Sequence, residues 1–171
     1  CVVLVVVFCL LCGGPPGVTR GRSSEASDVY KGRRLRERGI ERVRIVERGS
    51  DVGGTWYWNR YPGAACDVVS YDYLPLLDEL DYVPVNHYSR GPEIFAHCQA
   101  IADKYNLYEL SVFNTTVTET RWDDTDQLWH VSTDRGDVMR AQFVICANGT
   151  LAKPKLSTIS GMTSFSGHSC H

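Results

Sequence analysis

A chain of 171 residues has the length of about one domain. Its hydrophobic content of 43% and charged content of 22% are those of an ordinary globular protein. The formal net charge of −2 argues against nucleic acid and acidic membrane surfaces as partners, because both attract basic proteins. Composition narrows the class of protein without choosing a function.

Seven cysteines are scattered along the chain, at positions 1, 9, 12, 66, 98, 146 and 170. An odd and dispersed set does not form a disulfide framework and indicates a reducing compartment, so we expect a cytoplasmic protein. Cys9 and Cys12 have C-x-x-C spacing, but they lie in an apolar run without a second pair. We therefore expect no metal site.

The first twelve residues, CVVLVVVFCLLC, are almost purely apolar. They are too short to cross a bilayer, which requires about 20 residues, and they lack the basic start of a secretory signal. A run rich in Val and Leu is typical of a parallel strand that is buried on both faces. We interpret the run as such a strand, with a signal-anchor as the alternative.

Glycine, proline and serine dominate residues 13–27, which predicts a loop. A helix is expected from about Asp28 to Arg38, followed by a strand at VRIVE, residues 43–47. The segment from Tyr71 to Pro84 is irregular and aromatic. The clearest helix is predicted over residues 93–105, where apolar residues share one face at Ile94, Cys98, Ile101, Ala102 and Tyr105. His97 lies on the flank of that face and is expected to be hydrogen-bonded within the protein or solvated, and not a ligand.

Three strand-like stretches follow, at residues 111–121, 128–133 and 138–144. Alternation at Trp129-His130-Val131 indicates half-buried antiparallel strands, and hence a β-meander. The last stretch continues into FVICA, residues 143–147, which predicts a strand that is buried on both faces. The order of elements predicts the α/β class, with a Rossmann-like parallel sheet and an inserted antiparallel meander.

Glu47 ends a strand that follows a predicted helix. In a dinucleotide-binding unit, an acid at this point accepts hydrogen bonds from ribose hydroxyls. The pair Gly53-Gly54 follows shortly afterwards and would let the backbone approach a ligand closely. Together these residues favour a nucleotide site.

The stretch GGTWYWNRYPGAACD, residues 53–67, is too rich in glycine and proline for an ordinary helix or strand. It meets every fixed position of the signature (A or G)-G-x-W-x4-(F or Y)-P-(G or M)-x3-D, at Gly53, Gly54, Trp56, Tyr61, Pro62, Gly63 and Asp67. A second motif, F-x-G-x3-H, is formed by Phe165, Gly167 and His171. The paired motifs resemble those of the flavin-dependent Baeyer–Villiger monooxygenases. The resemblance extends over about residues 29–171.

The resemblance implies that residues 29–171 form an incomplete Rossmann-like FAD-binding domain ending in an inter-domain linker motif. Residues 1–28 form an atypical start that does not follow the family pattern. Among the site residues, Glu47 would hold the adenosine ribose of FAD, and Asp67 would lie by the flavin and the nicotinamide as a catalytic residue. The other residues implied to border the cofactors are Gly54, Thr55, Trp56 and Tyr73 near the flavin, Val117 near the adenine, and Ala65 and Cys66 on the NADPH side.

The phosphate-binding G-x-G-x-x-G of a Rossmann turn should begin about twenty residues before Glu47, near position 23. The residues there, Ser23-Ser24-Glu25-Ala26-Ser27-Asp28, include no glycine. Glu25 and Asp28 would repel a pyrophosphate, which prefers bare amides at a helix N-terminus. The glycines of GGPPG, residues 13–17, lie further from Glu47 than the fingerprint allows, and the prolines there lack amide donors.

The family role that the resemblance implies is an FAD- and NADPH-dependent monooxygenase that converts a small-molecule ketone, or a similar organic substrate, to an ester or lactone. We expect this chain to be a truncated form of such an enzyme, inactive as the fragment given. One alternative is a non-catalytic remnant that binds a nucleotide weakly or not at all. Another, a membrane-anchored interaction module, rests only on residues 1–12, and we do not expect a membrane as partner.

Overall fold

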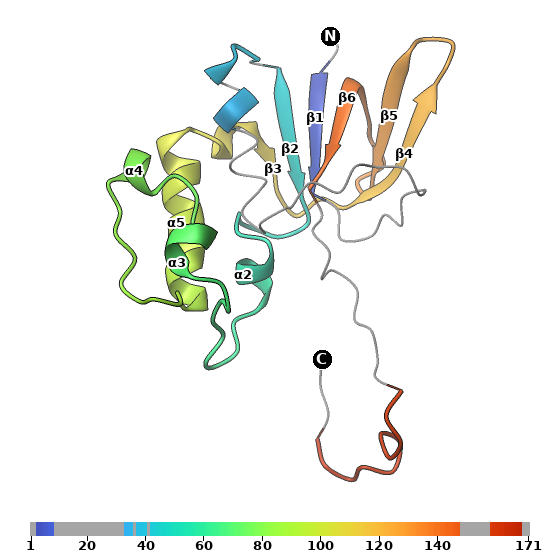
Figure 1. Ribbon diagram of the computed structural model, residues 1–171. Helices are drawn as coiled ribbons and strands as arrows, with labels where there is room; N and C mark the ends of the chain where they lie inside the picture. The colour runs from blue at the N-terminus through green and yellow to red at the C-terminus, as the bar shows by residue number, and fades with distance from the viewer. Residues whose placement is uncertain (1–2, 9–32, 36, 41, 148–157, 169–171) are drawn as a thin grey trace.

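The computed structural model describes residues 3–8, 33–35, 37–40, 42–147 and 158–168, and for residues 3–8 it describes the backbone alone. The described chain forms one six-stranded sheet, with helices gathered at one side of it (Figure 1). The strands are β1 (Val3–Phe8), β2 (Val43–Glu47), β3 (Ser111–Val112), β4 (Val117–Asp123), β5 (Leu128–Thr133) and β6 (Val138–Cys146). The strand order is β3-β2-β1-β6-β5-β4.

The sheet changes from parallel to antiparallel pairing at β6. Strands β3, β2, β1 and β6 pair in parallel, with Phe8 opposite Glu47 and Val7 opposite Cys146. Strands β6, β5 and β4 pair antiparallel as a meander. The predicted α/β fold, a parallel sheet with an antiparallel meander, is therefore confirmed. The apolar start contributes β1 to the parallel part, as its Val-rich run predicts. Residues 9–32, including the expected loop and positions 23–28, lie outside the described residues.

The predicted strand at residues 111–121 is two strands at opposite edges of the sheet. β3 pairs with β2, whereas β4 pairs with β5. The chain turns between them at Asn114, which has a left-handed φ of 51°. The amides of Asn114 and Thr115 donate to the carbonyls of Gly49 and Glu47, at 2.9 and 3.0 Å. These bonds to the end of β2 interrupt the strand, because the connecting residues cannot also pair with a neighbouring strand.

The prediction that residues 143–147 are buried on both faces is wrong. Phe143 is 65% exposed, and Cys146 is also exposed. In the described part of the chain, the helices gather near β2 and β3, and none covers β5 or β6 (Figure 1). A continuous apolar run indicates that a strand is hydrophobic. The strand is buried only where a second layer of structure packs against the sheet.

The long helix α5 (Gly91–Lys104) begins two residues before the predicted start. Arg90 is its N-cap and Pro92 lies in the first turn, where a missing amide proton costs nothing. Its apolar face is fully buried at Ile94, Cys98, Ile101 and Ala102, in one core cluster with Val43 and Ile45 of β2. Of the helix expected near residues 28–38, residues 33–35 and 37 are helical, and the rest lies outside the described ranges.

Single helical turns build the segment between β2 and α5. They are α2 (Thr55–Trp58), α3 (Ser70–Tyr73) and α4 (Leu77–Leu80), and a 3-10 turn, η1 (Tyr108–Leu110), follows α5. Left-handed residues flank α4, at Leu76 and Asp81, so it cannot extend in either direction. Among the helices within the described ranges, none combines the length and apolar character needed to cross a bilayer.

Candidate functional site

Glu47 lies at the carboxyl end of β2, beside the end of β1. Its side chain is buried, and Oε1 accepts a 2.6 Å hydrogen bond from the amide of Gly49. Ligands of open α/β sheets bind at the carboxyl ends of the parallel strands. The carboxylate is therefore fixed at the edge of the sheet where a nucleotide site is expected.

The segment from Arg48 to Gly54 connects Glu47 to α2 and is covered by aromatic rings. A Cβ at Gly49 would lie 3.0 Å from the ring of Tyr57, and one at Gly53 would lie 2.7 Å from the ring of Phe95. Gly53 also has a φ of 108°, which favours glycine. The absence of a side chain at position 53 thus makes room for the ring of Phe95, and the approach of a ligand to the glycine pair stays a prediction.

The residues Thr55–Trp58, predicted to be irregular, form the single helical turn α2. The turn begins at Gly54, whose φ of 50° and ψ of −116° suit glycine, and Thr55 follows it as the first helical residue. Trp56 is buried, and its indole N–H donates to the hydroxyl of Tyr73 at 2.8 Å. The two rings meet edge to face with centroids 6.1 Å apart. The structure therefore brings together two residues, Trp56 and Tyr73, that the resemblance assigns to the flavin side.

Two arginines lie over aromatic rings beside this turn. The Arg48 guanidinium lies 4.7 Å from the Trp58 ring centre, and that of Arg60 lies 4.5 Å from the ring centre of Tyr57 and 5.5 Å from that of Phe95. Such cation–π contacts hold an arginine in place while leaving it charged. A hollow of about 200 Å³ opens here, lined by Trp56, Asn59, Arg60, Tyr61, Ala64, Gly91, Pro92 and Phe95.

Residues 64–70, which contain Ala65, Cys66 and Asp67, are held against the start of α5. Ala65 bridges Arg90, and the Cys66 amide donates to the Ser89 carbonyl at 2.9 Å. Cys66 is buried, whereas Ala65 and Asp67 are exposed. This ladder fixes the backbone on both sides of Asp67 and leaves its carboxylate on the surface.

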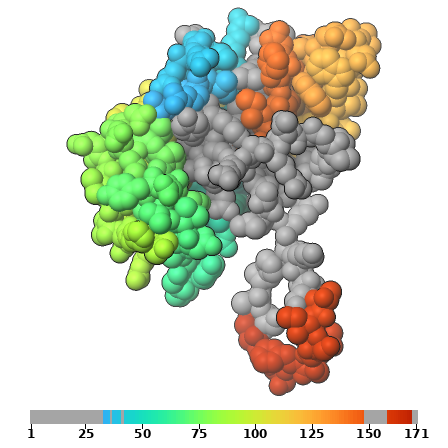
Figure 2. Space-filling model, viewed as in Figure 1, coloured from blue at the N-terminus to red at the C-terminus, as the bar shows by residue number. Residues whose placement is uncertain are grey.

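The remaining predicted site residues lie apart from α2. Val117 is buried at the start of β4, in a second core cluster with Val46, Val131 and Ala141. Phe165 and Gly167 belong to the segment 158–168, which lies apart from the body of the molecule (Figure 2). His171 lies outside the described residues.

Several residues that shape this region were not predicted from the sequence. Asp51 accepts hydrogen bonds from Tyr108 and Gln99, and Ser70 donates to the Asn86 carbonyl at 2.7 Å. A lone acid in a turn and a serine in a loop are common on surfaces, so neither carries a sequence signal. The aromatic residue Phe95 could have been found only from its place on the predicted helix.

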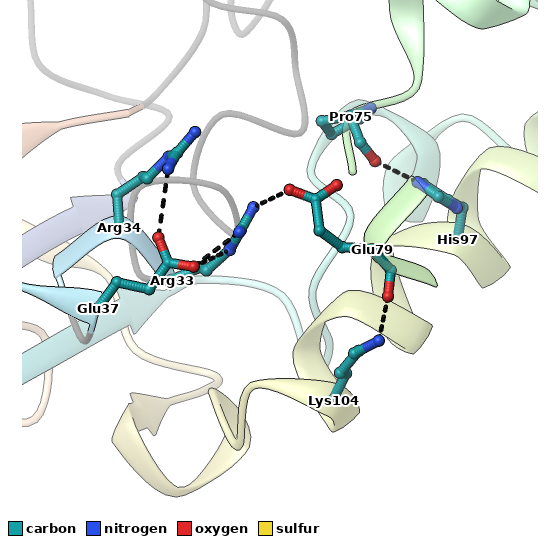
Figure 3. A network of polar contacts seen from close by, with 7 residues as sticks. All are labelled: Arg33, Arg34, Glu37, Pro75, Glu79, His97 and Lys104. Atoms are coloured by element: carbon teal, nitrogen blue, oxygen red, sulfur yellow. Dashed lines mark hydrogen bonds and ion pairs between the residues drawn. The ribbon is translucent and has the colours of Figure 1, made fainter. Parts of the chain in front are cut away.

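A buried arginine ties the first helix to α4 beside the core. The Arg33 guanidinium contacts Glu37 at 2.7 Å and Glu79 at 2.8 Å (Figure 3). It also lies over the ring of Tyr105. Lys104 of α5 donates to the carbonyl of Glu79. These contacts pair the Arg33 guanidinium with two carboxylates, which explains how an almost fully buried guanidinium is tolerated.

The turn between β4 and β5 contains one grouping of metal-type ligands within the described residues. Donor atoms of Asp123, Asp126 and His130 lie within 4.8 Å of one another. His130 pairs with Asp126 at 2.9 Å, and Asp123 accepts from Arg121 and the Thr125 amide. Each of the three side chains therefore has a hydrogen-bond or ion-pair partner within the turn and its two strands.

His97 is a buried, hydrogen-bonded histidine, the first of the two environments expected from the sequence. It is buried, and its Nε2 lies 2.7 Å from the carbonyl of Pro75 (Figure 3). Burial lowers the pKa of His97, partly opposed by the Pro75 carbonyl and the charge of Glu93. A lowered pKa in the folded state means that His97 stabilises the fold above the unfolded value of about 6.5, and that this stabilisation is lost as the pH falls further.

We therefore expect the melting temperature to fall as the pH is lowered from about 7 to about 5. The variant His97→Gln, which cannot titrate, should show a flatter dependence over the same range. Thermal unfolding followed by circular dichroism at a series of pH values measures both. The matched control is His87→Gln, which removes an exposed imidazole. Parallel curves for the wild type and His97→Gln would contradict the assignment.

No family model matches the chain. The chain is 55% identical over 144 residues to pentalenolactone D synthase of Streptomyces arenae. The aligned residues make up 84% of this chain and 24% of that protein. It is 51% identical over 143 residues to a Baeyer-Villiger monooxygenase of Streptomyces coelicolor, with 84% and 24% covered. The chain thus spans about a quarter of the length of these curated relatives.

Solved structures have the same fold. OTEMO in complex with FAD and NADP matches with a TM-score of 0.76 and 29% identity, over 96% of this chain and 28% of that one. An oxidized steroid monooxygenase bound to NADP matches with a TM-score of 0.75 and 35% identity, over 95% and 28%. The mixed sheet is therefore that of part of these flavoenzymes, and the incomplete coverage of each neighbour fits an incomplete domain.

Proposed function

Because the chain belongs to the family of flavin-dependent Baeyer–Villiger monooxygenases, we propose that it supplies part of the FAD site of such an enzyme. The proposed reaction of the whole enzyme inserts an oxygen atom beside a ketone carbonyl and gives an ester or lactone, with NADPH as the source of electrons. The observation that carries this proposal is the position of Glu47, buried at the carboxyl end of β2 and followed by the ordered turn that holds Trp56.

We assign described residues to the two ends of FAD. Glu47 presents a carboxylate at the strand end where a ribose is bound in dinucleotide folds, and we assign the ribose hydroxyls to it. Gly54, Thr55, Trp56 and Tyr73 are assigned to the flavin end. The mutual hydrogen bond of Trp56 and Tyr73 supports this assignment, because it fixes both rings before any ligand binds. Val117 is assigned to the adenine side.

Bound FAD would supply the redox chemistry, passing electrons from NADPH to dioxygen. The contribution of this chain is binding, orientation and electrostatics. Asp67 is assigned a catalytic role beside the flavin and nicotinamide, which its exposed carboxylate on a fixed backbone supports. Ala65 and Cys66 are assigned to the NADPH side, and Phe165, Gly167 and His171 to the inter-domain linker.

A non-catalytic remnant is the second candidate. It is favoured by the sequence that follows β1, which contains no G-x-G-x-x-G: the GGPPG of residues 13–17 has prolines in place of amide donors, and residues 23–28 include Glu25 and Asp28. A first strand–helix connection without this glycine pattern weakens the binding of a pyrophosphate. This candidate predicts a folded chain that does not saturate with FAD.

A titration of the purified chain with FAD, followed by flavin fluorescence and visible absorption, separates the two candidates. We expect saturable binding that Glu47→Ala weakens at least about tenfold, because hydrogen bonds to a charged group are lost. The control is Glu119→Ala, which removes an exposed acid from β4. Absence of binding by a wild-type chain that unfolds cooperatively would favour the remnant and overturn the proposal.

A further inference from the structure

The segment between Glu47 and α2 sets the distance and orientation between the two ends of the proposed site. We propose that Asp51 is a positioning residue that fixes this segment against α5 and η1, and so places Gly53, Gly54 and α2 relative to Glu47. The effect of Asp51 on cofactor binding rests on the proposed function. The effect of Asp51 on the position of the segment does not depend on that function.

The Asp51 carboxylate joins three parts of the chain. Oδ1 accepts the hydroxyl of Tyr108 at 2.9 Å and the amide of Val52 at 2.7 Å, and Oδ2 accepts the side-chain amide of Gln99 at 2.8 Å. Tyr108 belongs to η1, and Gln99 belongs to α5. Burial raises the pKa of Tyr108, and Asp51 raises it further, so the phenol remains a donor throughout the neutral range. One half-buried side chain thus anchors the turn to two other elements.

The residues after Asp51 lead directly into the aromatic turn. Val52 is buried in the main core cluster, and Gly53 lies under the ring of Phe95. The Gly53 carbonyl then accepts the Trp56 amide at 2.9 Å, and this bond starts α2. A change at Asp51 therefore reaches Trp56 through a few backbone bonds.

The residues before Asp51 lead back to Glu47. The Gly49 amide donates to the Glu47 carboxylate, and the Ser50 hydroxyl lies 2.8 Å from the hydroxyl of Tyr57 in α2. The segment is therefore held at its start by a hydrogen bond to Glu47 and in its middle by a hydrogen bond to Tyr57. The contacts of Asp51 attach this segment to the rest of the fold, which is why we assign the positioning role to it.

The first test is hydrogen exchange without any cofactor. In Asp51→Ala we expect amides of residues 52–58 to exchange about tenfold faster than in the wild type, since one anchored carboxylate and its three hydrogen bonds are lost. Asp51→Asn should recover most of the protection, because its amide oxygen still accepts from Tyr108 and Val52 while Gln99 can turn its own oxygen to the new donor. Residues 64–70 and 86–91 should be unchanged.

The chain offers a matched pair of tyrosines as a control. Tyr108→Phe removes a hydroxyl that donates to Asp51, and Tyr82→Phe removes a hydroxyl that donates to Glu93 at 2.8 Å. Tyr82 contacts neither Glu47 nor α2 through that bond. We expect Tyr108→Phe to accelerate exchange in residues 52–58 and Tyr82→Phe to leave it unchanged. Equal acceleration by the two variants would reveal a general loss of stability and overturn the inference.

The second test is the FAD titration with the same variants. We expect Asp51→Ala and Tyr108→Phe to weaken binding by about tenfold or less, without loss of the saturation level, and Tyr82→Phe to have no effect. If the wild type binds no FAD, the proposed function fails, and the exchange experiment still decides the role of Asp51. If exchange and FAD affinity are both unchanged in Asp51→Ala, the positioning role is wrong.

Discussion

Replacing Gly53 by alanine is expected to lower the free energy of unfolding by about 2–5 kcal/mol, since two penalties coincide. The backbone φ of 108° is one that alanine rarely adopts. In addition, the new methyl group would lie 2.7 Å from a ring carbon of Phe95, so the ring or the helix that carries it must move. Urea unfolding followed by circular dichroism measures the change.

Gly136→Ala is the matched control for this experiment. Gly136 also has a positive φ, of 80°, but no atom other than those of Gly136 and its two chain neighbours lies within 4 Å of the position of its Cβ. Backbone strain alone should cost about 1–2 kcal/mol there. Adding Phe95→Leu to Gly53→Ala should recover part of the larger loss, and a double-mutant cycle isolates that part. Equal losses for the two glycine variants would show that Phe95 does not press on Gly53.

The sequence predicts elements whose pattern is local. The strand Val43–Glu47 is found with the predicted bounds because its short run of β-branched residues ends in an acid. The strand Leu128–Thr133 is likewise found as predicted, between two polar turns. Helix α5 differs from its prediction only at its ends, since the apolar face of Ile94 and Ile101 defines its axis but not its cap.

Features that depend on distant partners were predicted wrongly or not at all. The separation of β3 from β4 follows from amides of Asn114 and Thr115 that bond to the end of β2, and no pattern within residues 111–121 reveals it. The exposure of Phe143 depends on which layer covers β6, a property of the fold as a whole. The need for glycine at position 53 comes from Phe95, a residue of another element.

In the candidate site, too, some residues carry a local sequence signal and others depend on distant partners. Glu47 could be predicted from its place at a strand end, and Trp56 and Tyr73 followed only from the resemblance to a family. That Trp56 and Tyr73 share a hydrogen bond could not be predicted, because it requires the course of the chain between α2 and α3. Asp51 carries no sequence signal, since its role arises from Gln99 and Tyr108, which meet it only in the folded protein.

Trp56→Ala is expected to have the largest effect among single substitutions in the site, about 3–5 kcal/mol of unfolding free energy. Trp56 is only 7% exposed, and its indole packs where a Cβ on Gly91 would lie 3.3 Å away. Its removal opens a cavity beside α5 and leaves the Tyr73 hydroxyl without its donor. Because a domain is stable by only about 5–15 kcal/mol, such a loss is a large share of the total.

The neighbouring Trp58 is the natural control, since it is 44% exposed and the Arg48 guanidinium lies over the face of its ring. Trp58→Ala should cost about 1 kcal/mol or less. If Trp56→Ala does not fold, Trp56→Phe and Tyr73→Phe, alone and combined, measure the shared hydrogen bond at about 1 kcal/mol. Equal unfolding midpoints for the two tryptophan variants would contradict the buried position of Trp56. With the midpoints separated as expected, loss of FAD binding in Trp56→Phe, which keeps an aromatic ring, would assign the indole N–H and Tyr73 to the cofactor as well as to the core.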